Sequence, residues 1–229
     1  PYQDANGYHY GLGINPFGRV GGSKVFCNSG DWCLSGDNFA GLASTSFNLG
    51  ARIGNNSWGA ESGGGYTTSD QVYDILVRDA QPGVPGNQEM SFIFSAGNAG
   101  PNDYTTLSPG NAKNVISVGA AENYRPEAYD GCNFGPSAAD NAQEIPSFSS
   151  RGPTQDGRVK PDLVAPGTHI TGAATQDPAY DGSGVCEKYY PDGQSLYTWS
   201  SGTSHSAPAA SGAASLVYRY YQDHFGGQA

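Results

Sequence analysis

The sequence predicts an α/β domain built on a parallel sheet with helices on both faces. Short apolar runs of strand length alternate along the chain with segments whose apolar residues recur at helical spacing. Several of these runs are continuously apolar, as expected of parallel strands that are buried on both faces. At 229 residues the chain suits a single domain of this kind, and no linker or internal repeat divides it.

The first expected elements lie between residues 19 and 56. Residues 19–26 alternate in the manner of a strand, and residues 37–49 space their apolar side chains at helical intervals. Gly50 is expected to end that helix. A short strand over 51–56 follows and leads into Ser57-Trp58-Gly59.

A second helix is expected after a glycine-rich loop. Thr68, with Gln71 three residues later, has the spacing of a capping box. The helix that it begins would run through the apolar residues Val72, Ile75 and Leu76.

The remaining elements complete the strand–helix alternation. Residues 90–95 and 114–119 are apolar runs of buried-strand length. Turn-forming residues fill 175–194, which predicts a surface insertion, and a last helix is expected from Ser204 onward. In open parallel sheets ligands bind beyond the carboxyl ends of the strands, so chemistry is expected in the loops that follow them.

Charge and hydropathy exclude two kinds of partner. The chain carries 11 Lys and Arg against 21 Asp and Glu, a net charge of −10, which disfavours binding to nucleic acid. No window approaches the ~20 consecutive apolar residues of a membrane span, so we expect no membrane insertion. The 34 glycines and 15 prolines indicate turns and close contacts between elements, and an aromatic content of 12% argues against disorder.

The four cysteines are Cys27, Cys33, Cys132 and Cys186. An even number in a chain of this composition favours disulfides and a secreted, extracellular protein. Three connectivities are available. The short turn-rich stretch between Cys27 and Cys33 favours that pair, which leaves Cys132 with Cys186. Free thiols or a zinc site are the alternatives, although the spacing lacks a C-x₂-C pair.

Ser204 stands at the head of a helix composed largely of Ala, Ser and Gly. Gly202 and Thr203 give the helix a sharp entry, and Pro208 lies near the first turn, where its missing N–H is tolerated. Free N–H groups and the helix dipole at this end favour a developing anion, which suits a nucleophile that attacks a carbonyl. Taken alone, however, the segment favours the simpler interpretation of Ser204 as an N-cap.

The segment Gly202-Thr203-Ser204-His205-Ser206-Ala207-Pro208 resembles the serine signature of the subtilisin-like serine proteases, the subtilases. Four more stretches resemble this family in the family's own order, and five ordered matches between residues 13 and 220 are specific. The four are the turn after the histidine-bearing helix (13–16), the strand edge that walls the substrate groove (56–59), the segment ending in the oxyanion-hole asparagine (95–98), and the connection to the serine (148–153 with 160–167).

The resemblance implies a role for each matching residue. Ser204 would be the nucleophile, and the Asn98 amide would stabilise the oxyanion together with the Ser204 backbone N–H. The Thr203 hydroxyl would contribute at longer range. Ser57-Trp58-Gly59 and Ser95-Ala96-Gly97 would pair with an extended peptide substrate and wall the pocket for the residue before the cut. Trp58 fits a core position equally well.

The family's aspartate motif and its H-G-T-H histidine motif would both precede the turn at residues 13–16, and the sequence matches neither. We therefore expect residues 1–229 to be the C-terminal part of a catalytic domain, with the missing N-terminal segment as a partner. The histidines are expected to be ordinary surface or loop residues, and they are His9, His169, His205 and His224.

Two expectations follow for the cut chain. It should be inactive on peptides, and it should expose a strand edge and an apolar patch beside Ser204. A non-catalytic, peptide-binding pseudoprotease is the alternative, although such a protein would need neither Ser204 nor Asn98. No catalytic cofactor is expected, and although structural calcium is common in the family, no run of ligand residues identifies a site here.

Overall fold

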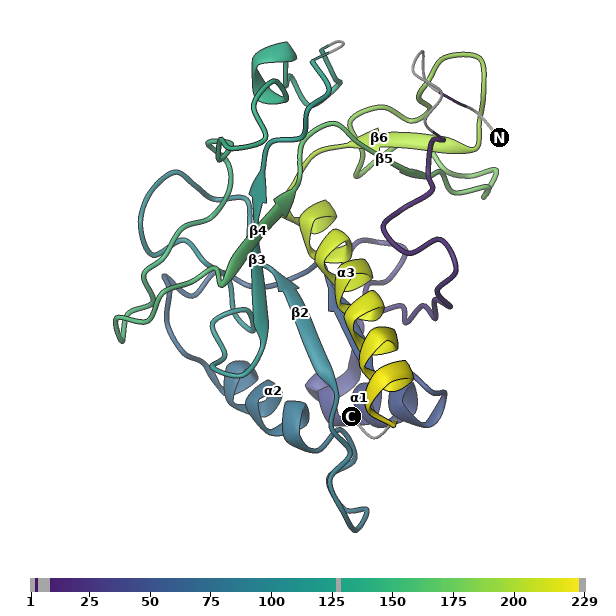
Figure 1. Cartoon of the computed structure of the whole chain (residues 1–229). Coiled ribbons are helices and arrows are strands. Elements are labelled where there is room, and N and C mark those ends of the chain that lie inside the picture. Colours follow the sequence, from purple (N-terminus) through teal and green to yellow (C-terminus); the bar gives the residue numbers. More distant parts are fainter. Residues whose placement is uncertain (1–2, 4–8, 127–128, 227–229) are drawn as a thin grey trace.

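The computed structural model describes residues 3, 9–126 and 129–226 of the chain (Figure 1). A four-stranded sheet has the order β1 (Ile53–Asn56), β2 (Ser91–Ser95), β3 (Ile116–Ala121) and β4 (Leu163–Pro166). Every neighbouring pair in this sheet is parallel. The expected α/β class is confirmed. Each strand predicted from residue 51 onward begins within two residues of its predicted first residue.

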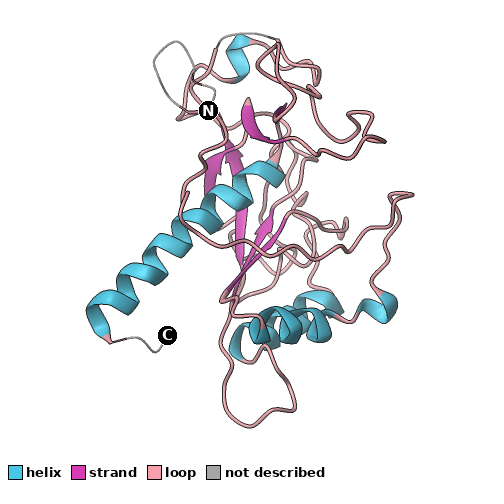
Figure 2. Ribbon diagram, turned by 90° about the vertical axis from the view of Figure 1, so that its right-hand side faces the viewer, coloured by secondary structure: helices cyan, strands magenta, loops and turns pink. Residues whose placement is uncertain are grey.

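Helices cover both faces of the sheet, as the sequence predicts. The helices α1 (Phe39–Asn48) and α2 (Thr68–Arg78) lie on one side, and α3 (Thr203–Phe225) crosses the other (Figures 1 and 2). Phe92 and Phe94 of β2 enter the core formed with α1 and α2, whereas Ile93 packs with Ala207 of α3. The alternation of side chains along β2 therefore divides the apolar interior into two layers.

The ends of α1 follow from local chemistry. The Asn38 side chain accepts a hydrogen bond from the Gly41 N–H at 2.9 Å and so caps the first turn. At the other end Gly50 has φ of +94°, and its N–H donates to the Phe47 carbonyl at 2.9 Å. A glycine adopts that left-handed conformation without steric cost, and the predicted stop at Gly50 is confirmed.

The capping box of α2 lies one residue before the predicted one. Thr67 and Asp70 form it, because the Thr67 N–H donates to Asp70 Oδ2 at 2.7 Å and the Thr67 side chain accepts from the Asp70 N–H. The prediction of Thr68 with Gln71 is therefore wrong. Asp70 is fully buried and also accepts the Thr67 hydroxyl at 2.9 Å, so its short side chain satisfies two donors at once.

The strand predicted over 19–26 is absent from the structure. Only Phe26 pairs there, in an isolated bridge with Trp32, and Val20 is 97% exposed. Alternating polarity leads to a strand only where a neighbouring strand is available for pairing. None of the described strands lies alongside this segment.

A two-stranded antiparallel sheet joins the main sheet to α3. It consists of β5 (Ile170–Ala173) and β6 (Tyr197–Ser200). The predicted insertion at 175–194 connects them as an irregular, partly exposed segment. Two short 3₁₀ helices, η1 (Ser35–Asp37) and η2 (Pro136–Ala138), complete the described elements.

An exposed sheet edge is present, as expected. The strand β1 ends the order of the sheet and pairs only with β2 within the described residues. Of the 23 residues of α3, Thr203, Ser206 and Ala207 are buried. The exposed apolar residues of that helix lie along its C-terminal half, not beside Ser204 as predicted, and they are Leu216, Val217, Tyr220, Tyr221 and Phe225. None of the described helices combines the length and the apolarity that crossing a membrane requires.

Candidate active site

Ser204 is the second residue of α3, directly after a turn that glycine alone adopts readily. Gly202, the N-cap, has φ of +148° and ψ of 160°, in a region of conformational space that is essentially restricted to glycine. The Gly202 N–H donates to the Gly167 carbonyl at 2.7 Å, which ties this turn to the end of β4. The head of α3 is thus fixed against the carboxyl edge of the main sheet.

The polar groups of Ser204 face the end of β1. Its hydroxyl donates to the Ser57 carbonyl at 3.3 Å, and the Ser57 hydroxyl donates to the Ser204 carbonyl at 2.8 Å. The Ser204 N–H belongs to the first turn, which has no intrahelical acceptor, and no described residue accepts from it. Ser204 is half-buried.

Asn98 follows β2 and lies against the same helix terminus. Its Oδ1 atom accepts hydrogen bonds from the Thr203 N–H and from the Thr203 hydroxyl, each at 2.9 Å. A Cβ atom placed on Gly202 would lie 3.3 Å from Asn98 Nδ2, so the amide stands directly beside the turn that leads to Ser204. The structure therefore brings Asn98 and Ser204 together at one site, as the motif order predicts.

The hydrogen bonds to Oδ1 determine which way the amide of Asn98 faces. Both Thr203 groups are donors, so the oxygen must point to them and the NH₂ group must point away. No described residue accepts from Nδ2, and Asn98 is exposed. The N–H of Ser204 and the NH₂ of Asn98 thus lie near one helix terminus without a described acceptor, and donors of this kind can stabilise an oxyanion.

Thr203 holds the Asn98 side chain in place and has little hydrogen-bonding capacity left for a substrate. The residue is fully buried, and its hydroxyl accepts the Gly97 N–H at 3.1 Å while donating its proton to Asn98. The single hydroxyl proton is therefore already in use. The structure favours a positioning role over the longer-range substrate contact that the resemblance implies.

The two predicted groove walls differ in their backbone hydrogen bonding. Trp58 and Gly59 follow β1, and their backbone N–H and C=O groups have no partner within the described residues. In contrast, the Ala96 N–H donates to the Val118 carbonyl at 2.9 Å, and the Ser150 N–H donates to the Gly97 carbonyl at 2.9 Å. The expectation that Ser95-Ala96-Gly97 adds a peptide strand is wrong, because β2 is a central strand and its continuation is already paired.

The Trp58 side chain is a core residue. Its ring stacks on Phe39 with centroids 5.7 Å apart and lies 4.9 Å from the ring of Trp32. Tyr73 and Phe94 make edge-on contacts with it from α2 and β2. The Trp58 ring is partly buried and packs against the core between the main sheet and the helices α1 and α2.

His169 lies in a loop, as predicted, but it is not at the surface. Its side chain is fully buried, with Nδ1 2.8 Å from the Arg125 carbonyl and Nε2 3.3 Å from the Phe134 carbonyl. The Asp130 carboxylate lies 3.8 Å from Nε2. The ring therefore lies against Arg125, Asp130 and Phe134, and sequence spacing alone gives no sign of these contacts.

Of the other three histidines, His205 and His224 lie on α3 and His9 lies in the N-terminal region. His205 is half-buried, and this burial lowers the pKa of its imidazole. His9 contacts Gln3, and His224 contacts the Tyr220 carbonyl one turn earlier on α3. Among the described side chains, no histidine nitrogen forms a hydrogen bond with the Ser204 hydroxyl.

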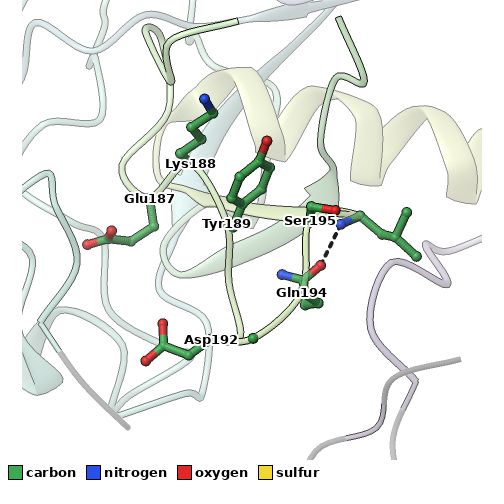
Figure 3. Close-up of a pocket in the computed structure, with 8 residues that line it drawn as sticks. Glu187, Lys188, Tyr189, Asp192, Gln194 and Ser195 are labelled. Carbon is green, nitrogen blue, oxygen red and sulfur yellow. Dashed lines mark hydrogen bonds between the residues drawn. The ribbon is translucent and has the colours of Figure 1, made fainter. Parts of the chain in front are cut away.

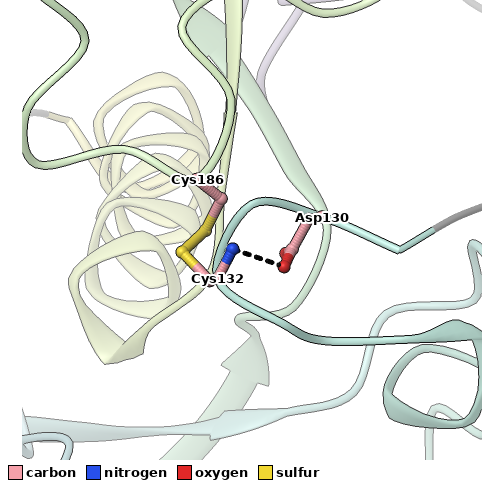
Figure 4. A group of neighbouring side chains, drawn as sticks. All are labelled: Asp130, Cys132 and Cys186. Carbon is pink, nitrogen blue, oxygen red and sulfur yellow. Dashed lines mark hydrogen bonds between the residues drawn. A yellow bond between two sulfur atoms is a disulfide. The ribbon is translucent and has the colours of Figure 1, made fainter.

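Both predicted disulfides are confirmed. The Cα atoms of Cys27 and Cys33 are 5.5 Å apart, and those of Cys132 and Cys186 are 4.7 Å apart. Asp130 lies beside the second bridge, where its carboxylate accepts the Cys132 N–H at 3.0 Å (Figure 4). Although Asp and Cys side chains can ligate metals, the two sulfurs are bonded to each other and are not available as thiolates.

A wide hollow of about 770 Å³ lies away from Ser204, on the segment that joins β5 to β6 (Figure 3). Gln194 lies in the lining of the hollow, and its side-chain oxygen accepts the Leu196 N–H at 2.6 Å. The hollow contains none of the predicted catalytic residues, and its lining consists of Glu187, Lys188, Tyr189, Asp192, Gly193, Gln194, Ser195 and Leu196.

Three residues of the site region received no role in the sequence analysis, although Ser150 and Gly167 lie in segments that resemble the family. Ser150 donates its N–H to Gly97 and accepts the Ala99 N–H at 3.1 Å, so it supports both sides of Asn98. Gly167 holds Gly202, and Leu107 packs between the two groove walls. The type of each residue alone carries no functional signal, and Ser150, Gly167 and Leu107 each have a partner more than 30 residues away in sequence.

Known proteins resemble the chain in sequence and in fold. The profile of Peptidase S8, the subtilase family, matches residues 2–227. Serine protease AprX of Bacillus subtilis is 34% identical over 129 residues, which cover 56% of this chain and 26% of that protein. Pyrolysin of Pyrococcus furiosus is 42% identical over 90 residues, which cover 34% of this chain and 6% of pyrolysin.

Solved structures show the same fold at low identity. The prenylagaramide maturation protease PagA superimposes with a TM-score of 0.56 at 21% identity, over 87% of this chain and 54% of its own. Sphericase superimposes with a TM-score of 0.52 at 21% identity, over 85% of this chain and 52% of its own. The chain spans about half the length of these proteases, and only about a quarter of AprX.

The profile covers nearly the whole chain, and the serine, the asparagine and the glycine turn converge at the carboxyl edge of the parallel sheet. The chain belongs to the subtilase family of serine proteases.

Proposed function

We propose that this chain supplies the nucleophile and the oxyanion donors of a secreted serine endopeptidase. Ser204 would attack the peptide carbonyl, and Asn98 and the Ser204 N–H would receive the oxyanion. The general base and its aspartate would come from a segment of the same protein that precedes residue 1. The observation that carries the proposal is the orientation of the Asn98 amide by Thr203 beside a free Ser204 N–H.

The chemistry would proceed in two displacements. The Ser204 oxygen forms a bond to the carbonyl carbon while its proton passes to the base, and the carbonyl electron pair moves onto the oxygen. That oxygen is held by the two N–H donors, which stabilise its negative charge. Collapse breaks the C–N bond as the base returns the proton to the departing amine. Water then repeats the attack on the ester and releases Ser204.

An extended peptide is the substrate that the groove supports best. The unpaired backbone groups of Trp58 and Gly59 can form a ladder with one more strand. The Ser57 carbonyl, 3.3 Å from the Ser204 hydroxyl, lies at the end of that ladder nearest the reacting atoms. This chemistry requires no cofactor, and the two disulfides support an extracellular location.

The test compares three proteins on casein and on a fluorogenic peptide. The full-length protein should hydrolyse both, the Ser204→Ala variant should retain less than about a thousandth of that rate, and residues 1–229 alone should be inactive. A full-length protein that binds a peptide without cleaving it would establish the pseudoprotease alternative. Equal activity in Ser204→Ala would overturn the role of Ser204.

A further inference from the structure

Leu107 and the residue after it span the gap between the two groove walls. The Leu107 N–H donates to the Ala96 carbonyl at 3.0 Å, which fastens it to the wall that continues β2. Ser108 and Ala60 exchange backbone hydrogen bonds of 2.8 and 3.0 Å, which fastens the next residue to the wall that continues β1. Leu107 is therefore at the floor between the walls.

The Leu107 side chain fills that floor. A Cβ atom placed on Gly97 would lie 2.6 Å from Leu107 Cγ, and one placed on Gly59 would lie 2.8 Å from Leu107 Cβ. Real Cβ atoms essentially never approach other atoms so closely, so both walls must carry glycine where the leucine packs. One leucine thus touches both walls at the positions where neither has a side chain.

The geometry of attack places one substrate side chain in this space. The reacting carbonyl must lie within reach of the Ser204 hydroxyl, with its oxygen toward Asn98. The Ser57 carbonyl accepts the Ser204 hydroxyl from the wall that continues β1, and Gly97, whose N–H donates to the Thr203 hydroxyl at 3.1 Å, lies in the other wall. The side chain that belongs to the reacting carbonyl then points between the walls, toward Leu107.

We propose that Leu107 limits the residue before the scissile bond to a small side chain, namely Gly, Ala or Ser. This inference rests on the proposed function and specifies its substrate class. The Leu107 side chain occupies the volume that a large aromatic or branched side chain would need. Moving a close-packed leucine aside costs free energy, because adding even a few methylenes to a filled space forces side chains and backbone into strained positions.

The test uses the full-length protein and a series of peptide p-nitroanilides that differ only in the residue before the cut. For the wild-type protein we expect kcat/KM with Ala to exceed kcat/KM with Phe by about tenfold or more, in line with the cost of a few methylenes in a pocket. Leu107→Gly should reverse this order, and Leu107→Ala should fall between. The matched control is Leu76→Ala, which also truncates a leucine but in the core beside α2. It should weaken stability without changing the order of substrates.

Fluorophosphonate labelling of each variant separates the possible failures. A wild-type protein that reacts with the probe but prefers Phe over Ala would overturn the inference and leave the proposed function intact. The inference also fails, with the proposed function intact, if both Leu107 variants are labelled and keep the wild-type order of substrates. A wild-type protein that neither reacts with the probe nor cleaves any peptide would overturn the proposed function, and the inference with it.

Discussion

Asn98 and Thr203 are joined by two hydrogen bonds of 2.9 Å, and these bonds decide which end of the Asn98 amide is available to a substrate. The backbone N–H and the hydroxyl of Thr203 both donate to Oδ1, which leaves the NH₂ group as the free end. In the proposed mechanism, the NH₂ group of Asn98 is therefore oriented before a substrate binds. Such preorganisation avoids the free energy of reorienting dipoles during the reaction.

Removal of the Asn98 donor should lower kcat far more than it raises KM. Asn98→Ala in the full-length protein is expected to lose about 10²–10³ in kcat, a magnitude established with subtilisin itself and carried over by family. Asn98→Asp keeps the shape but replaces the donor with a charge that repels the oxyanion, so it should be at least as slow. Steady-state kinetics on one peptide measure this, and a loss below about fivefold in both variants would remove Asn98 from the chemistry.

Thr203 should act through Asn98. Thr203→Val leaves the buried Gly97 N–H without its acceptor, which should reduce the free energy of unfolding by about 1–3 kcal/mol. It should also lower kcat with KM nearly unchanged, because the Asn98 amide loses one of its two anchors. Thr203→Ser restores the hydroxyl and should recover most of kcat. If Thr203→Ser is as slow as Thr203→Val, the hydroxyl is not what matters.

His205 should make the domain less stable in mild acid. Burial lowers the pKa of this imidazole below its usual value of about 6.5, so the unfolded chain binds a proton that the folded chain resists. Unfolding is then favoured as pH falls below about 6.5, and stability is recovered as pH rises through that range. His205→Asn should flatten this part of the profile between about pH 7.5 and 5, measured by urea unfolding. The control, His224→Asn on the exposed end of the same helix, should leave it unchanged.

The two disulfides should contribute unequally to stability. Cys132–Cys186 closes a loop with a sequence separation of 54 residues, and Cys27–Cys33 closes one of 6. The loop-entropy relation gives about 4 kcal/mol for the first and about 2 kcal/mol for the second. Paired Cys→Ser variants, compared by chemical unfolding under one condition, should therefore differ by roughly 2 kcal/mol. An equal loss, or a larger one for Cys27–Cys33, would show that strain or residual structure outweighs loop length.

The parallel sheet could be predicted from sequence because its signal is local and repeated. Continuous apolar runs over 90–95 and 114–119 can be buried only with both faces covered, and the structure places β2 and β3 there. The segment 19–26 carries a different local signal, alternating polarity, but remains irregular. A strand also depends on a partner, and the partner is not encoded in the strand's own residues.

The sequence indicates which residues are candidates for the site, but not how they contact one another. The order of the motifs indicates that Asn98 and Ser204 lie together, yet nothing in the sequence shows that Thr203 holds the amide by its oxygen. Similarly, the burial of His169 and the position of Leu107 depend on segments far away along the chain. Such features arise from tertiary packing, which residue type and spacing do not specify.

The most direct test of Ser204 as the nucleophile is covalent labelling of the full-length protein with a fluorophosphonate, followed by mass spectrometry of the tryptic peptides. The expected result is one adduct on Ser204 that forms in the wild-type protein, is absent in Ser204→Ala, and forms much more slowly in Asn98→Ala. An adduct on another serine, or undiminished labelling and peptide hydrolysis in Ser204→Ala, would contradict the assignment of Ser204 as the nucleophile.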